Sequence, residues 1–195
     1  MEKKRIILAS GSPRRKELLL QIGIDPEIIV SHVEERITSD VPSEVVMSLA
    51  EQKAVDVAQN MPEGAVVLGS DTVVAVDGKI LGKPKSHGEA YEMIKRLAGL
   101  SHQVYTGVCI VKKKAAGEED TVLSFYDETD VNVSPMTEAE IRTYADSEEP
   151  MDKAGSYAVQ GFFARYIEGL KGSYANVMGL PVHLVYQKLK ELGAV

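Results

Sequence analysis

Apolar residues along the chain fall into short runs separated by polar turns, and their spacing alternates between that of strands and that of helices. The first run, at 5–10, predicts a short buried strand. A helix should follow it, because Ser12 can cap it, Pro13 suits its first position and Gly23 can end it. Helical spacing or a capping pair predicts four more helices: 43–60, 86–99, 137–146 and 182–192.

Strand-like runs occupy much of the remaining chain: 26–33, 64–81, 102–114, 121–134, 162–170 and 172–181. The polar residues 69–72 divide 64–81 into two runs, and Asp77-Gly78 signals a hairpin turn. The loop 115–120 predicts that its flanking strands form an antiparallel pair. No repeat, low-complexity stretch or linker divides the chain, so we expect one α/β domain, 1–195, with a mixed sheet.

Composition narrows the class of protein. At 195 residues and 21.2 kDa, with 44% hydrophobic residues, the chain can bury a core without disulfides. Its 29 acidic and 22 basic residues give a net charge of -7, which opposes binding to a nucleic-acid polymer. A local cluster of Arg and Lys would still allow a small anionic ligand.

The compartment is inferred from cysteine usage and from the N-terminus. Cys109 is the single cysteine and lies in an apolar run, which favours a buried structural thiol over a nucleophile. The apolar stretch near the N-terminus is too short for a signal peptide, and no window is long enough to span a membrane. We therefore expect a cytoplasmic protein.

The stretch "LASGSPRRKE" at 8–17 has the layout of an anion site. A strand followed by small residues and a helix start presents free backbone N–H groups and the positive end of the helix dipole. Arg14 and Arg15 are disfavoured in a first helical turn unless an anion lies between them and the amides. Either a phosphate site or a solvated basic pair explains the stretch.

A carboxylate and a glycine-rich segment are further candidates. Asp71 lies where the two apolar runs of 64–81 meet, and a strand end there would expose it as a general base or a ligand for a hard cation. An Asx turn is the alternative. Gln160 lies among glycines, where its amide could bind a base edge, although tight turns also explain those glycines.

The remaining charged candidates are Glu35, Lys53 and Lys83, each of which is a solvated surface charge in the simplest interpretation. Pro84 makes the turn at Lys83 rigid, which suits a fixed charge for phosphate. The chain has neither a P-loop nor a Rossmann glycine motif.

Taken together, six blocks resemble the Maf family: "LASGSPRRKELL", "GSDTVV", "LGKP", "YTGV", "EPMDKAGSYAVQG" and "GSYANVMGLP". The likeness extends from residue 6 to about 185. It implies an elongated mixed α/β fold with two lobes and a central cleft, like that of inosine triphosphate pyrophosphatases, and it allows a homodimer. It also implies a house-cleaning enzyme that hydrolyses a nucleoside triphosphate to the monophosphate and pyrophosphate with a divalent cation, Mg or Mn.

The resemblance also assigns roles to residues. Asp71 matches the family's proton acceptor, and Glu35 and Asp71 match acidic residues at the metal. The remaining family positions lie around the triphosphate: Ser10, Arg14, Arg15, Lys53 and Lys83. Charge neutralisation and an oriented water are the main requirements for transfer at phosphorus, so this set is sufficient.

Three positions separate branches of that family. The branch that acts on dTTP and UTP has Arg, Thr and Gln where this chain has Arg14, Thr72 and Gln160, whereas the 7-methyl-GTP branch tends to have Trp, Gln and Glu. The resemblance therefore implies dTTP/UTP pyrophosphatase activity, with modified pyrimidine nucleotides as further substrates and a link to cell division arrest. Two alternatives remain: a sugar-phosphate nucleotidyltransferase and a non-catalytic, nucleotide-binding regulator of septum formation.

Overall fold

A seven-stranded mixed sheet forms the centre of the computed structural model, which describes residues 5–195. Its strands are β1 (Ile6–Leu8), β2 (Glu27–Ile28), β3 (Val66–Val76), β4 (Lys79–Leu81), β5 (Ser101–Lys112), β6 (Thr121–Val133) and β7 (Ile167–Lys171). They lie in the order β2-β1-β3-β5-β6-β7, and β4 pairs with β3. Strand β1 is parallel to β2 and β3, and the other pairs are antiparallel.

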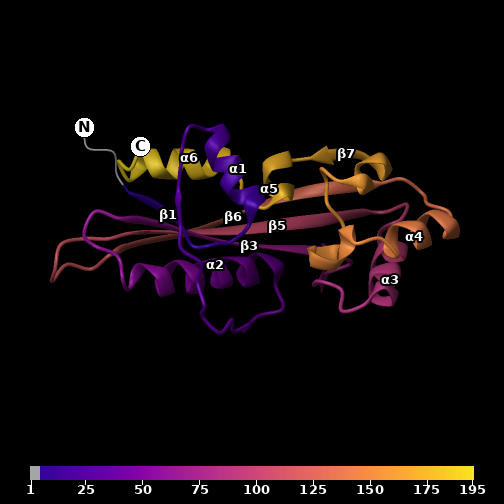
Figure 1. Ribbon diagram of the computed structural model, residues 1–195, viewed down its shortest axis with the longest axis horizontal. Coiled ribbons are helices and arrows are strands. Elements are labelled where there is room, and N and C mark those ends of the chain that lie inside the picture. The colour runs from indigo at the N-terminus through magenta and orange to yellow at the C-terminus, as the bar shows by residue number, and fades with distance from the viewer. Residues whose placement is uncertain (1–4) are drawn as a thin grey trace.

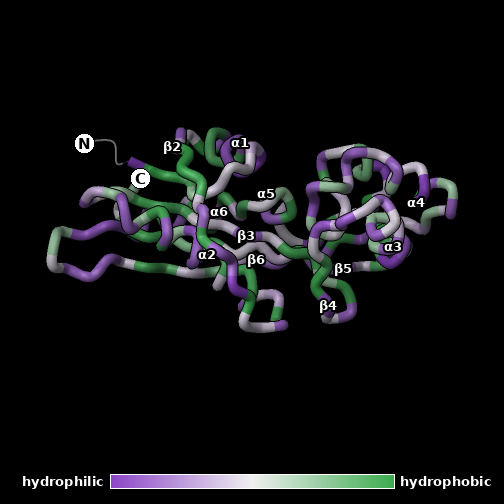
Figure 2. The backbone as a smooth tube through the Cα atoms, turned by 60° about the horizontal axis from the view of Figure 1, so that its bottom comes forward, coloured by the Kyte–Doolittle hydropathy of each residue, from purple (hydrophilic) through white to green (hydrophobic). Residues whose placement is uncertain are grey.

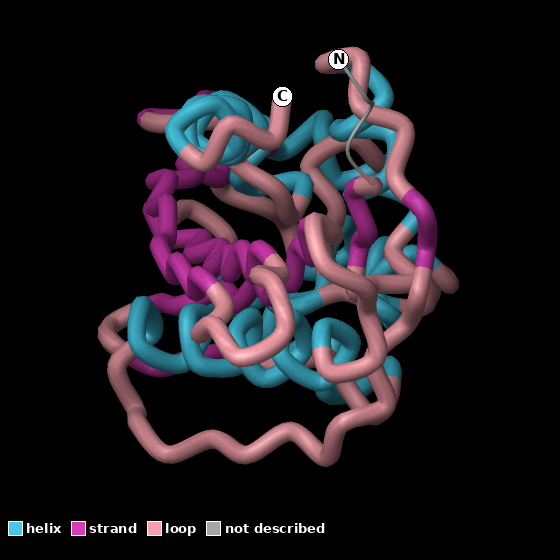
Figure 3. Tube along the Cα trace, turned by 90° about the vertical axis from the view of Figure 1, so that its left-hand side faces the viewer, coloured by secondary structure: helices cyan, strands magenta, loops and turns pink. Residues whose placement is uncertain are grey.

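Helices cover both faces of this sheet (Figures 1 and 3). They are α1 (Pro13–Gln21), α2 (Pro42–Ala58), α3 (His87–Leu97), α4 (Glu138–Ala145), α5 (Tyr174–Met178) and α6 (Val182–Glu191). Three short 3-10 helices complete the set: Glu149–Asp152, Ala154–Ser156 and Phe162–Tyr166. Helix α2 lies on one face, whereas α1, α5 and α6 lie on the other (Figure 1).

Two glycines bring α2 into direct contact with the sheet. A Cβ at Gly69 on β3 would lie 2.1 Å from the carbonyl oxygen of Ala50, and a Cβ at Gly107 on β5 would lie 2.2 Å from that of Val46. No side chain can occupy either position without moving the helix. The backbone of α2 therefore packs on β3 and β5 themselves.

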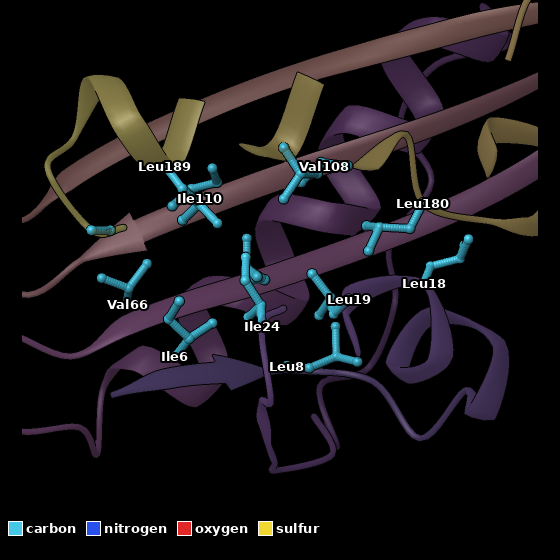
Figure 4. Packing of buried hydrophobic residues seen from close by; sticks show 13 residues of the cluster. Ile6, Leu8, Leu18, Leu19, Ile24, Val66, Val108, Ile110, Leu180 and Leu189 are labelled. Atoms are coloured by element: carbon cyan, nitrogen blue, oxygen red, sulfur yellow. The ribbon is translucent and has the colours of Figure 1, made fainter. Parts of the chain in front are cut away.

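The core divides between the two ends of an elongated molecule. An aliphatic cluster, which includes Leu8, Leu19 and Leu189, packs α1 and α6 on β1, β3 and β5 (Figure 4). A cluster rich in aromatic rings, with Tyr144 and Phe163 at its centre, packs α3 and α4 at the other end. Strands β3 and β5 run through both ends (Figure 2). This confirms the predicted mixed α/β fold with two lobes.

Most predicted helices are confirmed, with ends that shift by a few residues. Helices α2, α3, α4 and α6 correspond to the four predicted segments. One of the two predicted capping pairs is complete. The Thr137 hydroxyl and Glu140 carboxylate form a full capping box, whereas at α3 only the Ser86 hydroxyl caps, because the Glu89 carboxylate accepts the N–H of Lys85 instead.

Other predictions were wrong. Residues 69–72 do not interrupt a strand, since β3 is continuous and its Gly69 is the contact point for α2. Segment 172–181 contains helix α5 and no strand, because the Ser173 hydroxyl caps its start and Gly179, at φ 114°, ends it. Segment 26–33 has strand pairing only at β2.

Ser12 also differs from its predicted role. It occupies the N-cap position of α1, but its side chain makes no capping hydrogen bond. Its backbone N–H instead donates to the hydroxyl of Ser10 at 3.3 Å. The basic residues 3 and 4, which entered the prediction about a signal peptide, lie outside the described residues. Within residues 5–195, no helix has both the length and the apolar character needed to cross a membrane.

Candidate active site

A cavity of about 470 Å³ lies at a gap in the pairing of β3. On the side of β3 away from β5, β1 pairs with Val66–Leu68 and β4 pairs with Val74–Val76. Between them, residues 69–73 have no strand partner on that side. The cavity lies against this unpaired stretch, between the loop that follows β1 and the loop that follows β4.

All nine side chains predicted from the sequence line this cavity: Ser10, Arg14, Arg15, Glu35, Lys53, Asp71, Thr72, Lys83 and Gln160. They come from the loop after β1, the start of α1, the loop before α2, α2 itself, β3 and the loops after β4 and the second 3-10 helix. Asp71 is not at a strand end as expected. It is mid-strand, and it is accessible because its stretch of β3 lacks a neighbouring strand.

Arg15 is fixed in place by three hydrogen bonds. Its Nε donates to the carbonyl of Gly179 at 2.9 Å, and its Nη1 and Nη2 donate to the hydroxyls of Ser10 at 3.0 Å and Thr72 at 3.3 Å. Burial lowers the pKa of Arg15 from its ordinary value, although the nearby carboxylate of Asp71 opposes this. The guanidinium still has two N–H groups for a ligand.

Thr72 belongs to a buried chain of hydroxyls behind Arg15. Thr106, which is completely buried, donates its proton to the carbonyl of Asn176 at 2.9 Å. Since Thr106 has only one proton, it must accept the 2.9 Å hydrogen bond that joins it to Thr72. Thr72 therefore donates to Thr106 and accepts from Arg15, so the protein already uses its hydroxyl in both directions.

Lys53 joins two carboxylates on the opposite wall. Its Nζ lies 2.6 Å from Oδ1 of Asp71 and 3.0 Å from Oε1 of Glu35. The side chains of Lys53 and Asp71 are 15% and 16% exposed, so the pair is only partly screened by water. This contact fixes the position of the Asp71 carboxylate at the cavity wall.

The same three residues bear on whether a divalent cation fits. The ammonium of Lys53 stands between Glu35 and Asp71, so a positive charge is already accommodated there. Among residues 5–195 no cluster of three or more Asp, Glu, His or Cys could hold a metal by itself. Mg²⁺ commonly binds through one or two carboxylates and the phosphates of a substrate, and this pair fits that arrangement.

The other two predicted cations of the cavity are Arg14 and Lys83. In the described part of the chain, the side chains of Arg14 and Lys83 make no hydrogen bond or salt bridge, and both line the cavity. The charge of Arg14 in the first turn of α1, which is unfavourable for the helix alone, therefore faces the space where an anion would bind.

The lining is not entirely charged. It also includes Val74, Val104, Tyr157 and Met178, together with the exposed Gln160, whose side chain has no hydrogen-bond partner in the described chain. Apolar side chains with one adaptable amide suit the faces and edge of a planar base. The cavity therefore combines cationic groups with an apolar, base-compatible surface.

Asp152, Lys153 and Tyr157 line the cavity but were not predicted as site residues. Lys153 contacts the carboxylate of Asp152, and its Nζ lies 3.4 Å from the carbonyl oxygen of Glu149. All three lie in the block "EPMDKAGSYAVQG", so the adjacent opposite charges in that block were the available signal.

Comparison with known proteins gives one family. A family model described as Maf-like protein matches residues 5–192. Relatives named dTTP/UTP pyrophosphatase align over nearly the whole chain. The protein of Lachnoclostridium phytofermentans is 46% identical over 97% of this chain and 95% of its own length. That of Agathobacter rectalis is 48% identical over 97% and 98%, and that of a Bacillus cereus strain is 50% identical over 96% and 95%.

Proposed function

The chain belongs to the Maf family, and on that premise we propose that it is a nucleoside triphosphate pyrophosphatase that hydrolyses dTTP and UTP to the monophosphate and pyrophosphate. The observation that carries the proposal is one cavity whose lining joins five cations, three carboxylates and several apolar side chains. The names of the relatives support the choice of dTTP and UTP.

The cations that line the cavity would supply most of the stabilisation of the transition state. Transfer at phosphorus spreads negative charge over the phosphate oxygens, and cations held in place beforehand stabilise that charge without reorganising. Arg15 is held by three hydrogen bonds, so its remaining N–H groups are already oriented before the nucleotide binds. Arg14 and Lys83 are available to bind the rest of the triphosphate.

Asp71 is the proposed general base. A water molecule attacks the α-phosphorus, its proton passes to the Asp71 carboxylate, and the bond from that phosphorus to the bridging oxygen breaks to release pyrophosphate. Lys53 holds the carboxylate in position before the reaction. Glu35 and Asp71 would hold the divalent cation, which would neutralise phosphate charge when bound.

Base selection is assigned to Gln160, which can both donate to and accept from a pyrimidine edge. Thr72 is assigned an indirect part in base selection, because its hydroxyl is already bonded to Arg15 and Thr106 and is not free to contact the base. We expect Gln160→Glu and Thr72→Gln each to weaken the use of dTTP and UTP more than they weaken folding. Unchanged nucleotide preference with a normal thermal midpoint would count against both roles.

The direct test incubates the pure protein with UTP and Mg²⁺ or Mn²⁺ and measures UMP and pyrophosphate. Asp71→Asn should lower kcat about a hundredfold or more, because the base is lost. Asp25→Asn is the matched control, since Asp25 is exposed and does not line the cavity. Equal persistence of UTP with the wild-type protein and with Asp71→Asn would show that the enzyme proposal is wrong.

The same assay separates the alternatives. A sugar-phosphate nucleotidyltransferase would release pyrophosphate only when a sugar phosphate is added, and a regulator would bind UTP without consuming it. We further propose a cytoplasmic location, consistent with the lone buried Cys109, and a homodimer. A link to cell division arrest is a separate hypothesis, and cells that carry Asp71→Asn would show whether it needs catalysis.

A further inference from the structure

The carboxylate of Glu149, which does not line the cavity, joins the two ends of one loop. Its Oε2 accepts the backbone N–H of Phe162 at 2.7 Å, and its Oε1 accepts that of Phe163 at 3.3 Å. Oε1 also accepts the phenol of Tyr144 at 3.0 Å. Three donors thus converge on one carboxylate, and hydrogen bonds to an ionised acceptor are stronger than those between neutral groups.

The residues enclosed by this contact form a wall of the cavity. Glu149 and Phe162 are thirteen positions apart, and the segment between them supplies Asp152, Lys153, Tyr157 and Gln160 to the cavity. Gln160 lies two residues before the amide that Glu149 holds. The position of its side chain therefore depends on how firmly the ends of this loop are joined.

The fit at Gly161 shows how close this contact is. A Cβ built at Gly161 would lie 2.4 Å from each oxygen of the Glu149 carboxylate. Distances below 3.0 Å are essentially never observed for a Cβ, so a larger residue would displace the carboxylate. The glycine directly after Gln160 is thus the residue that lets the carboxylate reach both amides.

A buried aromatic cluster supports the other side of the carboxylate. The ring of Tyr144 lies 5.0 Å from that of Phe163, which lies 4.9 Å from that of Tyr157 on the cavity wall. Burial, together with the adjacent Glu149, raises the pKa of Tyr144 well above its ordinary value. Its hydroxyl is therefore a permanent donor to the carboxylate.

We propose that Glu149 is a positioning residue for base recognition, which joins the ends of the loop 150–161 and thereby holds Gln160 against the bound pyrimidine. The inference rests on the dTTP/UTP activity proposed above, because Gln160 is assigned to the base there. It adds a residue that touches neither the nucleotide nor the reacting atoms.

The test compares Glu149→Gln with Glu148→Gln, which removes the same charge one position earlier from an exposed side chain. In Glu149→Gln one carboxylate oxygen becomes an NH₂ group, which faces an N–H donor and cannot accept from it. We expect the KM for UTP to rise and the ratio of kcat/KM for UTP to that for CTP to fall about tenfold, with kcat for UTP nearly unchanged. Glu148→Gln should match the wild type.

A second measurement does not depend on activity. Hydrogen exchange at the amides of Phe162 and Phe163 should become faster in ligand-free Glu149→Gln and in Gly161→Ala, and should not change in Glu148→Gln. If Glu149→Gln does not fold, Tyr144→Phe carries the same test, because it removes one donor and leaves the ring packing in place.

An unchanged UTP/CTP ratio overturns the proposal, as does unchanged exchange at the two amides. Equal losses of kcat for both nucleotides also overturn it, because they indicate a merely structural role. Failure of the wild-type protein to hydrolyse UTP would instead overturn the proposed function, and the exchange experiment would still show whether Glu149 holds the loop.

Discussion

Hydrogen bonds to neighbouring residues fix the direction of the Arg15 guanidinium. The guanidinium is held by Ser10, Thr72 and Gly179, and Thr72 is in turn held by Thr106. These hydrogen bonds restrict the guanidinium before a ligand binds, so little conformational entropy remains to be lost on binding. The direction of Arg15 is thus set by the folded protein.

Thr106→Val tests that chain. Valine has nearly the same shape but no hydroxyl, so Thr72 loses its acceptor and the carbonyl of Asn176 keeps only the N–H of Gly179 as a donor, at a cost of about 1–3 kcal/mol in the free energy of unfolding. We expect kcat/KM for UTP to fall roughly tenfold as Arg15 becomes less well positioned. The measurements are urea unfolding and steady-state kinetics, with exposed Thr38→Val as the control. Wild-type kinetics in Thr106→Val would contradict the positioning role.

His102 gives a prediction about pH. It is completely buried, its Nε2 is 2.7 Å from the hydroxyl of Tyr157, and burial lowers its pKa from 6.5 to about 4, against the opposing charge of Asp130. Below pH 6.5 the unfolded chain binds a proton that the folded protein does not. Stability should therefore be fully present above pH 6.5 and fall by about 3 kcal/mol as the pH approaches 4.

His102→Gln should remove that part of the pH dependence, because glutamine does not titrate and can still form a hydrogen bond to Tyr157. Urea unfolding at pH 7 and at pH 4.5 measures the difference between the variant and the wild type. Parallel losses of stability in the two proteins would show that His102 does not contribute.

Among the elements, α2 packs closely against β3 and β5. Gly69 and Gly107 leave no space between the helix backbone and the sheet, and Lys53 on α2 reaches Asp71 on β3 across this interface. The close packing therefore sets the distance between the ammonium and the carboxylate. A change in packing should disturb chemistry as well as stability.

Gly107→Ala makes that coupling measurable. The new Cβ would lie 2.2 Å from the carbonyl oxygen of Val46, so α2 must shift, and overpacking of this kind costs about 1–3 kcal/mol or more. We expect a lower thermal midpoint and a lower kcat in the folded fraction. Gly117→Ala, at a turn with open space around it but φ of 95°, serves as a control for strain alone. An unchanged kcat in Gly107→Ala would show that the packing of α2 on the sheet does not affect catalysis.

Elements differ in how far their residues predict them. Helices α3 and α4 have local capping pairs, so their positions follow from neighbouring residues. The continuity of β3 depends on its contact with α2, and the pairing gap that exposes Asp71 depends on where β1 and β4 stop; neither is a local property. Likewise, the donors on Glu149 come from Tyr144 and from Phe162 and Phe163, which only the folded chain brings together.

At the scale of the whole molecule, the overall charge and the local charge have opposite signs. The chain carries -7, while Arg14, Arg15, Lys53, Lys83 and Lys153 all line one cavity. Two lobes that share β3 and β5 enclose this cluster, so the cations are presented inwards and do not form a basic outer surface. A small anion can reach them, whereas a polymer meets the acidic exterior first.

Competition with nucleic acid tests that arrangement. We expect a single-stranded oligonucleotide, added at a concentration tenfold above that of UTP, to leave the initial rate of UMP formation unchanged at about 0.1 M salt. Inorganic triphosphate, which has the charge without the polymer, should inhibit. Inhibition by the oligonucleotide that weakens as salt is added would show that the cations are accessible to polymers.

The single cysteine has a practical consequence. Cys109 is completely buried beneath α2, and burial raises the pKa of its thiol to about 11, so it is protonated at neutral pH. Maleimide reagents need an accessible thiolate and should not react with Cys109. The wild-type chain therefore serves as the unlabelled control. In the variant Glu148→Cys, the new cysteine would carry the only fluorophore or spin label. The signal of that label would report directly on movement of the neighbouring loop.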